Sequence, residues 1–342
     1  MRHLASRATV LAAATLAGLA AAAAPAAADP VELRVATLAP PGSTWMKILD
    51  KGAAKVSDKT EKRVSLKWYA GGVQGDERDY VRKIRLGQLD GAAVTSVGLS
   101  MIDESIRVLE LPRMFASIDE MDYVADKMWP YFVAKFEKKG FKLTDRGEIG
   151  WIYFYSKSEV TTLDQLKGLK LWQWGDDSIV SAMYKKLGLN GTPLGVPEVD
   201  SALQTGRING CYGSPLTTVA LQWNTKIKYQ TEMPMSYGIG ATVMSLDALK
   251  KMSADDQKTM LDLAKKMGKD IRKGVRKDNV EAGKQMKSKG VKLTTTPPAM
   301  VDQFTKAAEE VWNELAGKIY SKDELAMVLK YRDEYRKKHP AK

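Results

Sequence analysis

Histidine is almost absent from this chain of 342 residues. The two histidines are His3 and His339, one near each end, so the body of the chain contains none. Ser-His-Asp and Cys-His catalysis need an imidazole as general base, and ordinary zinc and iron sites are rich in histidine ligands. The sequence shows no motif of paired acids either. We therefore expect no catalytic residues, no metal site and no cofactor, and an enzyme is the least favoured class of function.

Cysteine is equally scarce, and Cys211 is the single example. One cysteine excludes an intramolecular disulfide. We interpret Cys211 as a small buried hydrophobe, with a free reactive thiol as the alternative.

A long apolar run is found only at the start of the chain. Arg2 and Arg7 introduce an Ala-rich stretch that ends in Ala26-Ala27-Ala28. This pattern predicts a secretory signal peptide over residues 1–28, cut before Asp29, with a membrane anchor as the alternative. No cysteine near the cut offers a lipid attachment point. We expect a protein of the bacterial periplasm that is not itself embedded in the membrane.

Basic residues outnumber acidic ones. The chain has 53 Lys and Arg against 41 Asp and Glu, and removing Arg2 and Arg7 leaves 51 basic residues. The lysines are spread over segments such as "FEKKGFK" and "YRDEYRKKH", which look like solvated helix faces. We expect no nucleic-acid partner, although a positive field can steer an acidic partner or ligand.

The first part of the chain alternates strand and helix patterns. Apolar alternation predicts strands, and a 3.6-residue apolar period predicts helices. The expected order is a strand over 31–39, a helix over 44–59, a strand over 63–72, a helix over 76–88 and a strand over 89–99. A β-α-β order of this kind favours parallel strands with helices on their faces.

A second β-α-β unit follows. We expect a strand over 150–157, a short helix and a strand within 162–174, a helix over 177–190 and a helix followed by a strand within 197–213. Two such units suggest two lobes with a cleft between them, and ligands of open α/β sheets bind at the carboxyl ends of the strands.

The rest of the chain reads as helix. Residues 253–290 form a long helical stretch in which Ser253 is a good N-cap. Gly268, Gly274 and Gly283 make a kink or a break plausible. A last helix is expected from about Pro298 to His339.

Several motifs in order resemble one family. They are "RVATLAPPGSTW", "GGVQGDERDYVRKIRLGQLDGAAVTSVG", "VLELPRMF", "LDQLKGLKLW", "LGLNGTPLGVPEVDSALQTGRINGCYGSPL" and "LKKMSADDQKTMLDLA". Each motif alone is weak, but their order and spacing together resemble the DctP-type solute-binding proteins of tripartite ATP-independent periplasmic (TRAP) transporters. The resemblance covers nearly all of the chain after the signal peptide.

The resemblance implies an α/β fold of two lobes, each a mixed sheet flanked by helices. Hinge strands and a long helix join the lobes. The implied boundaries are 29–152 plus about 241–281 for the first lobe and 153–240 plus about 282–342 for the second. It also implies that the lobes close around a small-molecule ligand and that the closed form docks on membrane permease subunits driven by an ion gradient.

The chain departs from the family at the positions that usually hold a carboxylate. The resemblance places a clamping arginine at the position of Trp172 and a second arginine at that of Ile152. It places an asparagine at the position of Ser214, close to Tyr212. Because burying a carboxylate without a cation is costly, these replacements favour an uncharged ligand that is largely apolar or aromatic, with a lipid-like molecule as one possibility.

Strand alternation puts Trp172 and Trp174 on one face and Gln173 on the other. The alternative is that both tryptophans are core residues packed under a helix. The same alternative of core packing applies to Trp45 and Trp223. The complete set of expected ligand-binding residues is Trp172, Trp45, Trp151, Ile152, Tyr153, Trp174, Tyr212, Ser214 and Trp223.

The leading hypothesis is a TRAP-type periplasmic receptor for an apolar ligand. A second hypothesis keeps the receptor but binds an organic acid through Lys170, Arg146 or Arg207, and a variant binds a sugar or a cation stacked on the tryptophans. A third is a periplasmic carrier of hydrophobic cargo that works without a permease.

Overall fold

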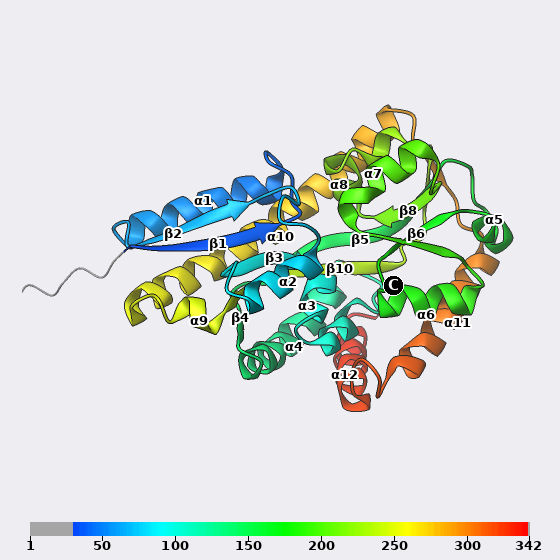
Figure 1. Ribbon diagram of the computed structural model, residues 1–342. Helices are drawn as coiled ribbons and strands as arrows, with labels where there is room; N and C mark the ends of the chain where they lie inside the picture. Colours follow the sequence, from blue (N-terminus) through cyan, green and yellow to red (C-terminus); the bar gives the residue numbers. More distant parts are fainter. Residues whose placement is uncertain (1–29, 341–342) are drawn as a thin grey trace, which may run out of the picture.

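The computed structural model describes residues 30–340, which form an α/β protein with two lobes side by side (Figure 1). The predicted signal peptide of residues 1–28 lies outside the described residues. Among residues 30–340, no helix is both long enough and apolar enough to span a membrane.

The first lobe contains the first predicted β-α-β unit. Its elements are β1 (Val31–Thr37), α1 (Thr44–Lys59), β2 (Val64–Tyr69), α2 (Glu77–Arg85) and β3 (Gly91–Thr95). β1 lies in the middle, with β2 and β3 parallel to it on either side. The alternation of β1 buries Leu33 and Val35 completely. The pairing of β1 with β2 and β3 confirms the predicted parallel order. A helix forms each of the two crossovers, as is usual between parallel strands.

Residues 96–99 do not continue the third strand, although their apolar pattern predicts it. They form the start of α3 (Ser96–Ser100). The Thr95 hydroxyl accepts a hydrogen bond from the Val97 N–H at 3.1 Å, and the Glu77 carboxylate accepts one from the Gly98 N–H at 2.8 Å. These oxygens satisfy N–H groups that a helix start leaves free, so the strand ends at Thr95.

The first lobe is completed by η1 (Glu104–Glu110), α4 (Ile118–Lys138) and β4 (Phe141–Leu143). In α4 buried apolar residues recur every three or four positions, at Met121, Val124, Met128, Phe132 and Phe136. This spacing gives the helix one apolar face, which packs into the main core.

The second lobe contains the second predicted unit. Its elements are α5 (Leu163–Lys167), β6 (Leu171–Trp174), α6 (Ser178–Leu187), β7 (Gly191–Leu194), α7 (Val196–Thr205), β8 (Gly210–Gly213), α8 (Pro215–Ala220), η2 (Trp223–Thr225) and β9 (Tyr229–Thr231). β6 is parallel to β7 and β8. α6 ends at Gly188, whose left-handed conformation (φ 67°) closes the helix.

Two long antiparallel strands join the lobes: β5 (Gly147–Ser156) and β10 (Ser236–Ser245). Residues 147–152 of β5 pair with β10, whereas residues 153–156 pair with β8. The sheet order β2-β1-β3-β10-β5-β8-β6-β7 therefore passes from one lobe to the other along β5. These are the hinge strands that the resemblance implies.

The long helix also joins the lobes. After the short α9 (Leu246–Leu249), α10 (Ala254–Ser288) runs for 35 residues and contacts both α1 and α8 (Figure 1). It shows no break at its glycines. A Cβ at Gly268 would lie 3.0 Å from the backbone oxygen of Arg146. Gly268 therefore permits a close approach between α10 and the chain that enters β5.

The expected last helix is two helices. After β11 (Lys292–Thr294), the chain forms α11 (Pro298–Leu315) and α12 (Lys322–Lys338). Between them Gly317 adopts φ 85°, and the Ser321 hydroxyl caps α12 by accepting from the Glu324 N–H. α11 packs on α6, whereas α12 packs on α4 of the first lobe. The segment 282–342, assigned to the second lobe from the sequence, thus ends in a helix that lies on the first.

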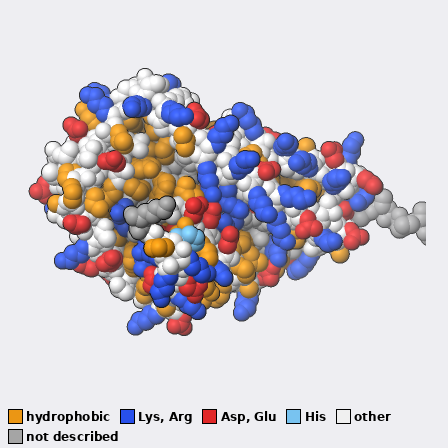
Figure 2. Space-filling view, turned by 180° about the vertical axis from the view of Figure 1, so that it is seen from behind, with side chains coloured by type: hydrophobic (Ala, Val, Ile, Leu, Met, Phe, Trp, Pro, Cys, Tyr) orange, Lys and Arg blue, Asp and Glu red, His pale blue; other side chains and the backbone are white. Residues whose placement is uncertain are grey.

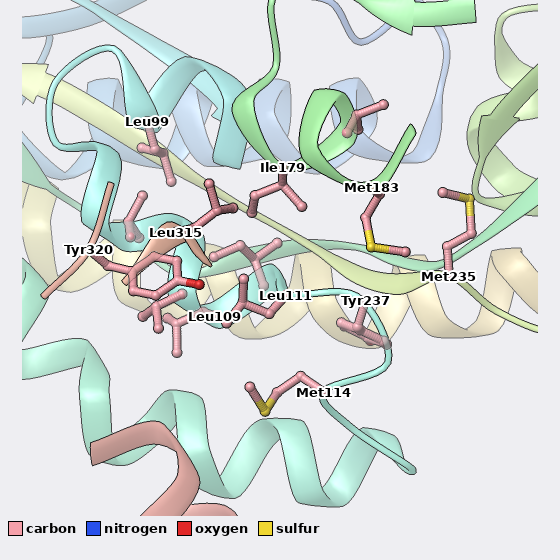
Figure 3. Close-up of a cluster of buried hydrophobic side chains, with 14 of the residues drawn as sticks. Leu99, Leu109, Leu111, Met114, Ile179, Met183, Met235, Tyr237, Leu315 and Tyr320 are labelled. Atoms are coloured by element: carbon pink, nitrogen blue, oxygen red, sulfur yellow. The ribbon is translucent and has the colours of Figure 1, made fainter. Parts of the chain in front are cut away.

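The two lobes share one hydrophobic cluster. Figure 3 shows Ile179 and Met183 from α6 close to Leu109 and Leu111, which come from the first lobe. Leu315 and Tyr320, at the break between the last two helices, join the same cluster. This shared cluster connects the two lobes through apolar contacts.

The surface of the first lobe is rich in basic side chains. Figure 2 shows Lys and Arg side chains dense over the part that carries α10, with Asp and Glu between them. The mixture of signs agrees with the expected solvated helix faces.

Candidate functional site

A cavity of about 200 Å³ lies between the two lobes. This is many times the roughly 10–15 Å³ that one water molecule needs. The cavity reaches the carboxyl ends of four strands, with Thr37 of β1, Thr95 of β3, Trp174 of β6 and Gly213 of β8 in its lining. Hinge residues such as Ile152 and Gly238 complete its wall. The cavity thus lies at the strand ends, where ligands of open α/β sheets bind.

Trp172 is the centre of an aromatic group on the second lobe. Its ring is stacked on Tyr212 with 4.6 Å between centroids, and the rings of Trp223 and Trp174 lie 5.4 Å and 5.9 Å away. Trp172 is only 2% exposed, and its Nε1–H donates to the carbonyl of Leu194 at 3.0 Å. Because its one polar atom is satisfied inside the lobe, Trp172 offers the cavity an apolar ring.

Trp174 makes a contact between the lobes. Its Nε1–H donates to the carboxylate of Asp76, which precedes α2 in the first lobe, at 3.1 Å. The same carboxylate accepts from the N–H of Val196 at 2.9 Å, at the start of α7. Trp174 therefore lines the cavity and also connects its two sides.

The structure brings six of the nine expected ligand-binding residues to the cavity wall: Trp172, Trp45, Ile152, Trp174, Tyr212 and Trp223. Trp172 and Trp223 are also core residues of the second lobe, as the alternative of core packing predicts, and their role in ligand binding stays a prediction. Trp45 and Ile152 come from α1 and the hinge, and they extend the apolar lining.

Three expected residues lie away from the cavity lining. Trp151 packs edge-on against Tyr237 with 5.0 Å between ring centroids, and Tyr153 packs against the core of the second lobe. Both point away from Ile152, as strand alternation requires. Ser214 is completely buried, and its hydroxyl caps α8 by accepting from the N–H of Thr217 at 3.2 Å. Two signals in the sequence point to these positions. Strand alternation places Trp151 and Tyr153 on the face opposite Ile152, and a serine before a proline is typical of a helix N-cap, as at Ser214.

Charged residues of the cavity were not expected from the sequence. Arg107 of η1 lines it, and its Nη2 forms an ion pair with the Asp177 carboxylate at 2.8 Å, across the cleft. Its Nε lies 3.8 Å from the Glu110 carboxylate. Burial alone lowers the pKa of Arg107, but the two carboxylates outweigh it and hold this pKa above its ordinary value. Arg107 is thus a cation whose charge the protein itself neutralises.

Asp177 has two roles. It caps the following helix, where one carboxylate oxygen accepts from the N–H groups of Ile179 and Val180, each at 3.0 Å. The other oxygen binds Arg107. An aspartate directly before a helix is a typical N-cap that local sequence can indicate. The ion pair depends on Arg107, which lies 70 positions earlier and in the other lobe.

Two carboxyl groups of the cavity have strongly raised pKa values. Burial raises the pKa of Glu77 to about 7, despite hydrogen bonds from Thr95 and Gly98. Burial raises the pKa of Glu110 to about 8, and the charges of Asp177 and Glu77 reinforce this rise against the attraction of Arg107. Both groups therefore keep a proton more readily than an exposed glutamate.

The cations proposed for an organic acid do not line the cavity. Arg146 pairs with Asp122 and Asp126 at 3.0 Å and 2.9 Å, and Lys170 and Arg207 are exposed elsewhere. Among residues 30–340, Arg107 is the one Lys or Arg in the cavity lining. The organic-acid hypothesis thus has no support from the residues first named for it.

Within residues 30–340, no group of three His, Cys, Asp or Glu side chains is placed to hold a metal ion. Cys211 is completely buried, and burial raises the pKa of its thiol. It is the small hydrophobe expected from the sequence.

Comparison with known proteins gives one family. The family model described as bacterial extracellular solute-binding protein, family 7 (DctP), matches residues 35–319. A solute-binding protein of Chromohalobacter salexigens is 34% identical over 173 residues, 50% of this chain and 51% of that protein. The chain thus matches about half the length of this relative. Another solute-binding protein, from Verminephrobacter eiseniae, is 25% identical over 71% of this chain and 73% of its own length.

Solved structures agree in fold. A TRAP periplasmic solute-binding protein from Citrobacter koseri, with bound D-glucuronate, is 26% identical with a TM-score of 0.80, covering 88% of this chain and 99% of its own. The sugar acid binding protein from Advenella mimigardefordensis, in complex with galactonate, has a TM-score of 0.84 at 20% identity, with coverage of 90% and 99%. Both neighbours bind sugar acids.

Proposed function

The chain belongs to the DctP family, family 7 of the bacterial extracellular solute-binding proteins, and on this premise we propose a specific role for it. It is the periplasmic receptor of a TRAP-type transporter. Its lobes close around an uncharged ligand that is largely apolar or aromatic, and the closed form delivers this ligand to the membrane permease. Members of such a family bind and release solutes, so no reaction is assigned.

The observation that carries the ligand class is the state of Arg107. The neighbours hold sugar acids, and a carboxylate in a buried site needs a cation. Here the cation of the cavity is engaged by Asp177 at 2.8 Å and approached by Glu110 at 3.8 Å. An acid ligand would have to displace a protein carboxylate, and that carboxylate would then remain buried without its partner.

Apolar contact supplies much of the affinity in this proposal. Burying about 300 Å² of apolar ligand surface contributes roughly 7 kcal/mol before the costs of association. Micromolar binding needs about 8 kcal/mol net. The aromatic group around Trp172 supports the apolar part, and the shortfall indicates that the ligand also makes a polar contact.

A second candidate is an organic acid bound at Arg107. The observation that favours it is the position of Arg107 in the cavity lining. In this case the ligand carboxylate replaces Asp177 as the partner of the guanidinium, and binding weakens strongly with salt.

The test is native mass spectrometry of the protein purified from periplasm, followed by organic extraction of what accompanies it. We expect a neutral molecule with a substantial apolar part. An empty protein that takes up D-glucuronate with micromolar affinity would contradict the ligand class and favour the second candidate. Failure of the protein to bind any small molecule from periplasmic extract would contradict the receptor role itself.

A further inference from the structure

Of the three neighbouring carboxyl groups of Glu77, Glu110 and Asp177, Glu110 has the fewest hydrogen-bond partners. Its Oε2 accepts a hydrogen bond from the hydroxyl of Ser96. Its Oε1 has no hydrogen-bond donor among residues 30–340, and Glu110 lines the cavity at the C-terminal end of η1. An oxygen without a protein partner at a cavity wall is available to a ligand.

Glu77 is engaged very differently. Its carboxylate accepts from the Thr95 N–H, the Thr95 hydroxyl and the Gly98 N–H, each at 2.8 Å. These three donors oppose the rise in pKa that burial causes, so the pKa of Glu77, about 7, stays below that of Glu110, about 8. Glu77 thus has a structural role at the start of α3, which Glu110 does not share.

The charges around Glu110 do not balance if all acids are ionised. Glu77 from α2 and Asp177 before α6 are its acidic neighbours, and within residues 30–340 Arg107 is the one cation that faces it. α3 contributes the hydroxyl of Ser96, and β10 contributes Gly238, which carries no charge. Arg107 is closer to Asp177 than to Glu110, at 2.8 Å against 3.8 Å. Of the three acids, Glu110 therefore has the weakest compensation, and it retains a proton most readily.

We propose that Glu110, in its protonated form, is the residue that selects the ligand by donating a hydrogen bond to an oxygen of the ligand. This inference rests on the proposed function and names the polar part of its ligand. The ligand combines an apolar or aromatic body, held against the group around Trp172, with a carbonyl, ether or hydroxyl oxygen directed at Glu110. The raised pKa of Glu110, to about 8, agrees with this role.

A neutral Glu110 also explains how the cavity can exclude acids and still hold a polar group. A carboxylate ligand would face Asp177 and Glu77 with no free cation, whereas a carbonyl oxygen meets a donor. Above the pKa of Glu110 the donor is lost, and its carboxylate then repels the oxygen of the ligand. Binding of such a ligand should weaken as the pH rises.

The experiment uses two neutral probes of similar shape, 2-acetylnaphthalene and 2-ethylnaphthalene. Only the first carries an acceptor oxygen. Their dissociation constants are measured by quenching of tryptophan fluorescence at about pH 6.5 and about pH 9.5. In the wild-type protein we expect the ratio of the two constants to shift about three- to tenfold in favour of the ketone at the lower pH, because one hydrogen bond is gained.

Two variants separate Glu110 from other titrating groups. Glu110→Gln keeps an N–H donor that does not titrate, so the ratio should be the same at both pH values and close to the wild-type ratio at low pH. Glu110→Leu has no donor, so its ratio should match the wild-type ratio at high pH. Circular dichroism of each variant checks that it is folded, and 2-ethylnaphthalene reports any general change of the cavity.

The outcomes are distinguishable. A pH-independent ratio in the wild type, with both probes bound, would overturn the role of Glu110 and leave the apolar receptor intact. A pH-dependent ratio that persists in Glu110→Gln would assign the donor to another residue. Binding of neither probe would overturn the proposed ligand class and this inference with it.

Discussion

Trp172 touches both the cavity and the core of the second lobe. Its ring packs with Tyr212 and Trp223, and its Nε1–H is bound to Leu194. The carbonyl of Trp172 in turn accepts from the hydroxyl of Tyr184 at 2.8 Å. A side chain held from so many directions is rigid, which favours a preformed apolar wall.

Replacing this ring should affect both binding and stability. We expect Trp172→Ala to weaken binding of 2-ethylnaphthalene at least tenfold and to lower the free energy of unfolding by about 3–5 kcal/mol, because it opens a void in the core. Urea unfolding measures the change in stability. Quenching of the fluorescence of the remaining tryptophans by the probe measures the change in binding. The control is Trp312→Ala, which removes a buried tryptophan outside the cavity lining. Equal weakening of binding in both variants would contradict a direct role of Trp172.

Asp177 neutralises the charge of Arg107 in the cavity lining. Asp177→Asn keeps a side-chain oxygen to cap α6 but removes the charge that holds Arg107. We expect this variant to bind D-glucuronate at least tenfold more tightly than the wild type, because the guanidinium becomes free to pair with the ligand. Isothermal titration calorimetry at low salt measures the gain.

The matched control is Asp176→Asn. Asp176 is the neighbouring residue, and its side chain is 88% exposed in an ion pair with Arg78. It does not line the cavity, so its loss should leave D-glucuronate binding unchanged. If Asp177→Asn also remains unable to bind the sugar acid, Arg107 is not what excludes acids.

At the scale of elements, α10 shows how glycine in a helix can serve packing rather than bending. A Cβ at Gly268 would lie 2.8 Å from the Cβ of Asp145 and 3.0 Å from the backbone oxygen of Arg146, so the segment before β5 lies directly against the helix. At Gly283, in the same helix, nothing lies within 4 Å of such a Cβ. The close contact with the segment before β5 therefore requires a glycine at position 268, whereas no contact requires one at position 283.

This difference predicts opposite effects of the same substitution. Gly268→Ala should lower the free energy of unfolding by about 1–3 kcal/mol through overpacking. Gly283→Ala should raise it by up to about 1 kcal/mol, because alanine is the better helix former. Chemical denaturation of both variants measures the pair. A stabilising effect at Gly268 would mean that the segment before β5 moves away easily.

At the scale of the whole molecule, the cleft concentrates buried acids with raised pKa values. Glu77 and Glu110 have pKa values of about 7 and about 8 against an ordinary value of 4.5. In this range the folded protein binds more protons than the unfolded chain. The free energy of unfolding therefore falls as the pH rises from about 5 to about 8. Acids with lowered pKa values, such as Asp90 and Glu324, act in the opposite sense and only at lower pH.

Glu110→Gln should reduce this pH dependence. We expect urea unfolding to show a smaller loss of stability between about pH 5 and about pH 8 in the variant, because one acid with a raised pKa is removed. At about pH 8 the variant should be more stable than the wild type, since no charge has to be buried. An unchanged slope would place the proton on a different residue.

The local pattern of the chain determined the elements and their order. The apolar period of residues 44–59 predicted α1 with its correct bounds, and the two β-α-β units predicted two lobes with a cleft at the strand ends. Six of nine proposed site residues line the cavity, because strand ends and βα turns follow from the order of elements. The errors at residues 96–99 and 316–321 arose where side-chain caps, rather than apolar period, decide where a helix starts.

Only the tertiary structure decided which charges meet. Arg107 and Asp177 lie 70 positions apart and on different lobes, and no periodicity relates them. The same holds for Asp76 and Trp174, whose contact joins the lobes. Electrostatic interactions depend on distance and burial, which depend on how the lobes pack, whereas secondary structure depends on neighbours along the chain. The sequence by itself therefore determined the receptor fold and the apolar wall, and the packing of the two lobes determined that the cation of the cavity is already neutralised.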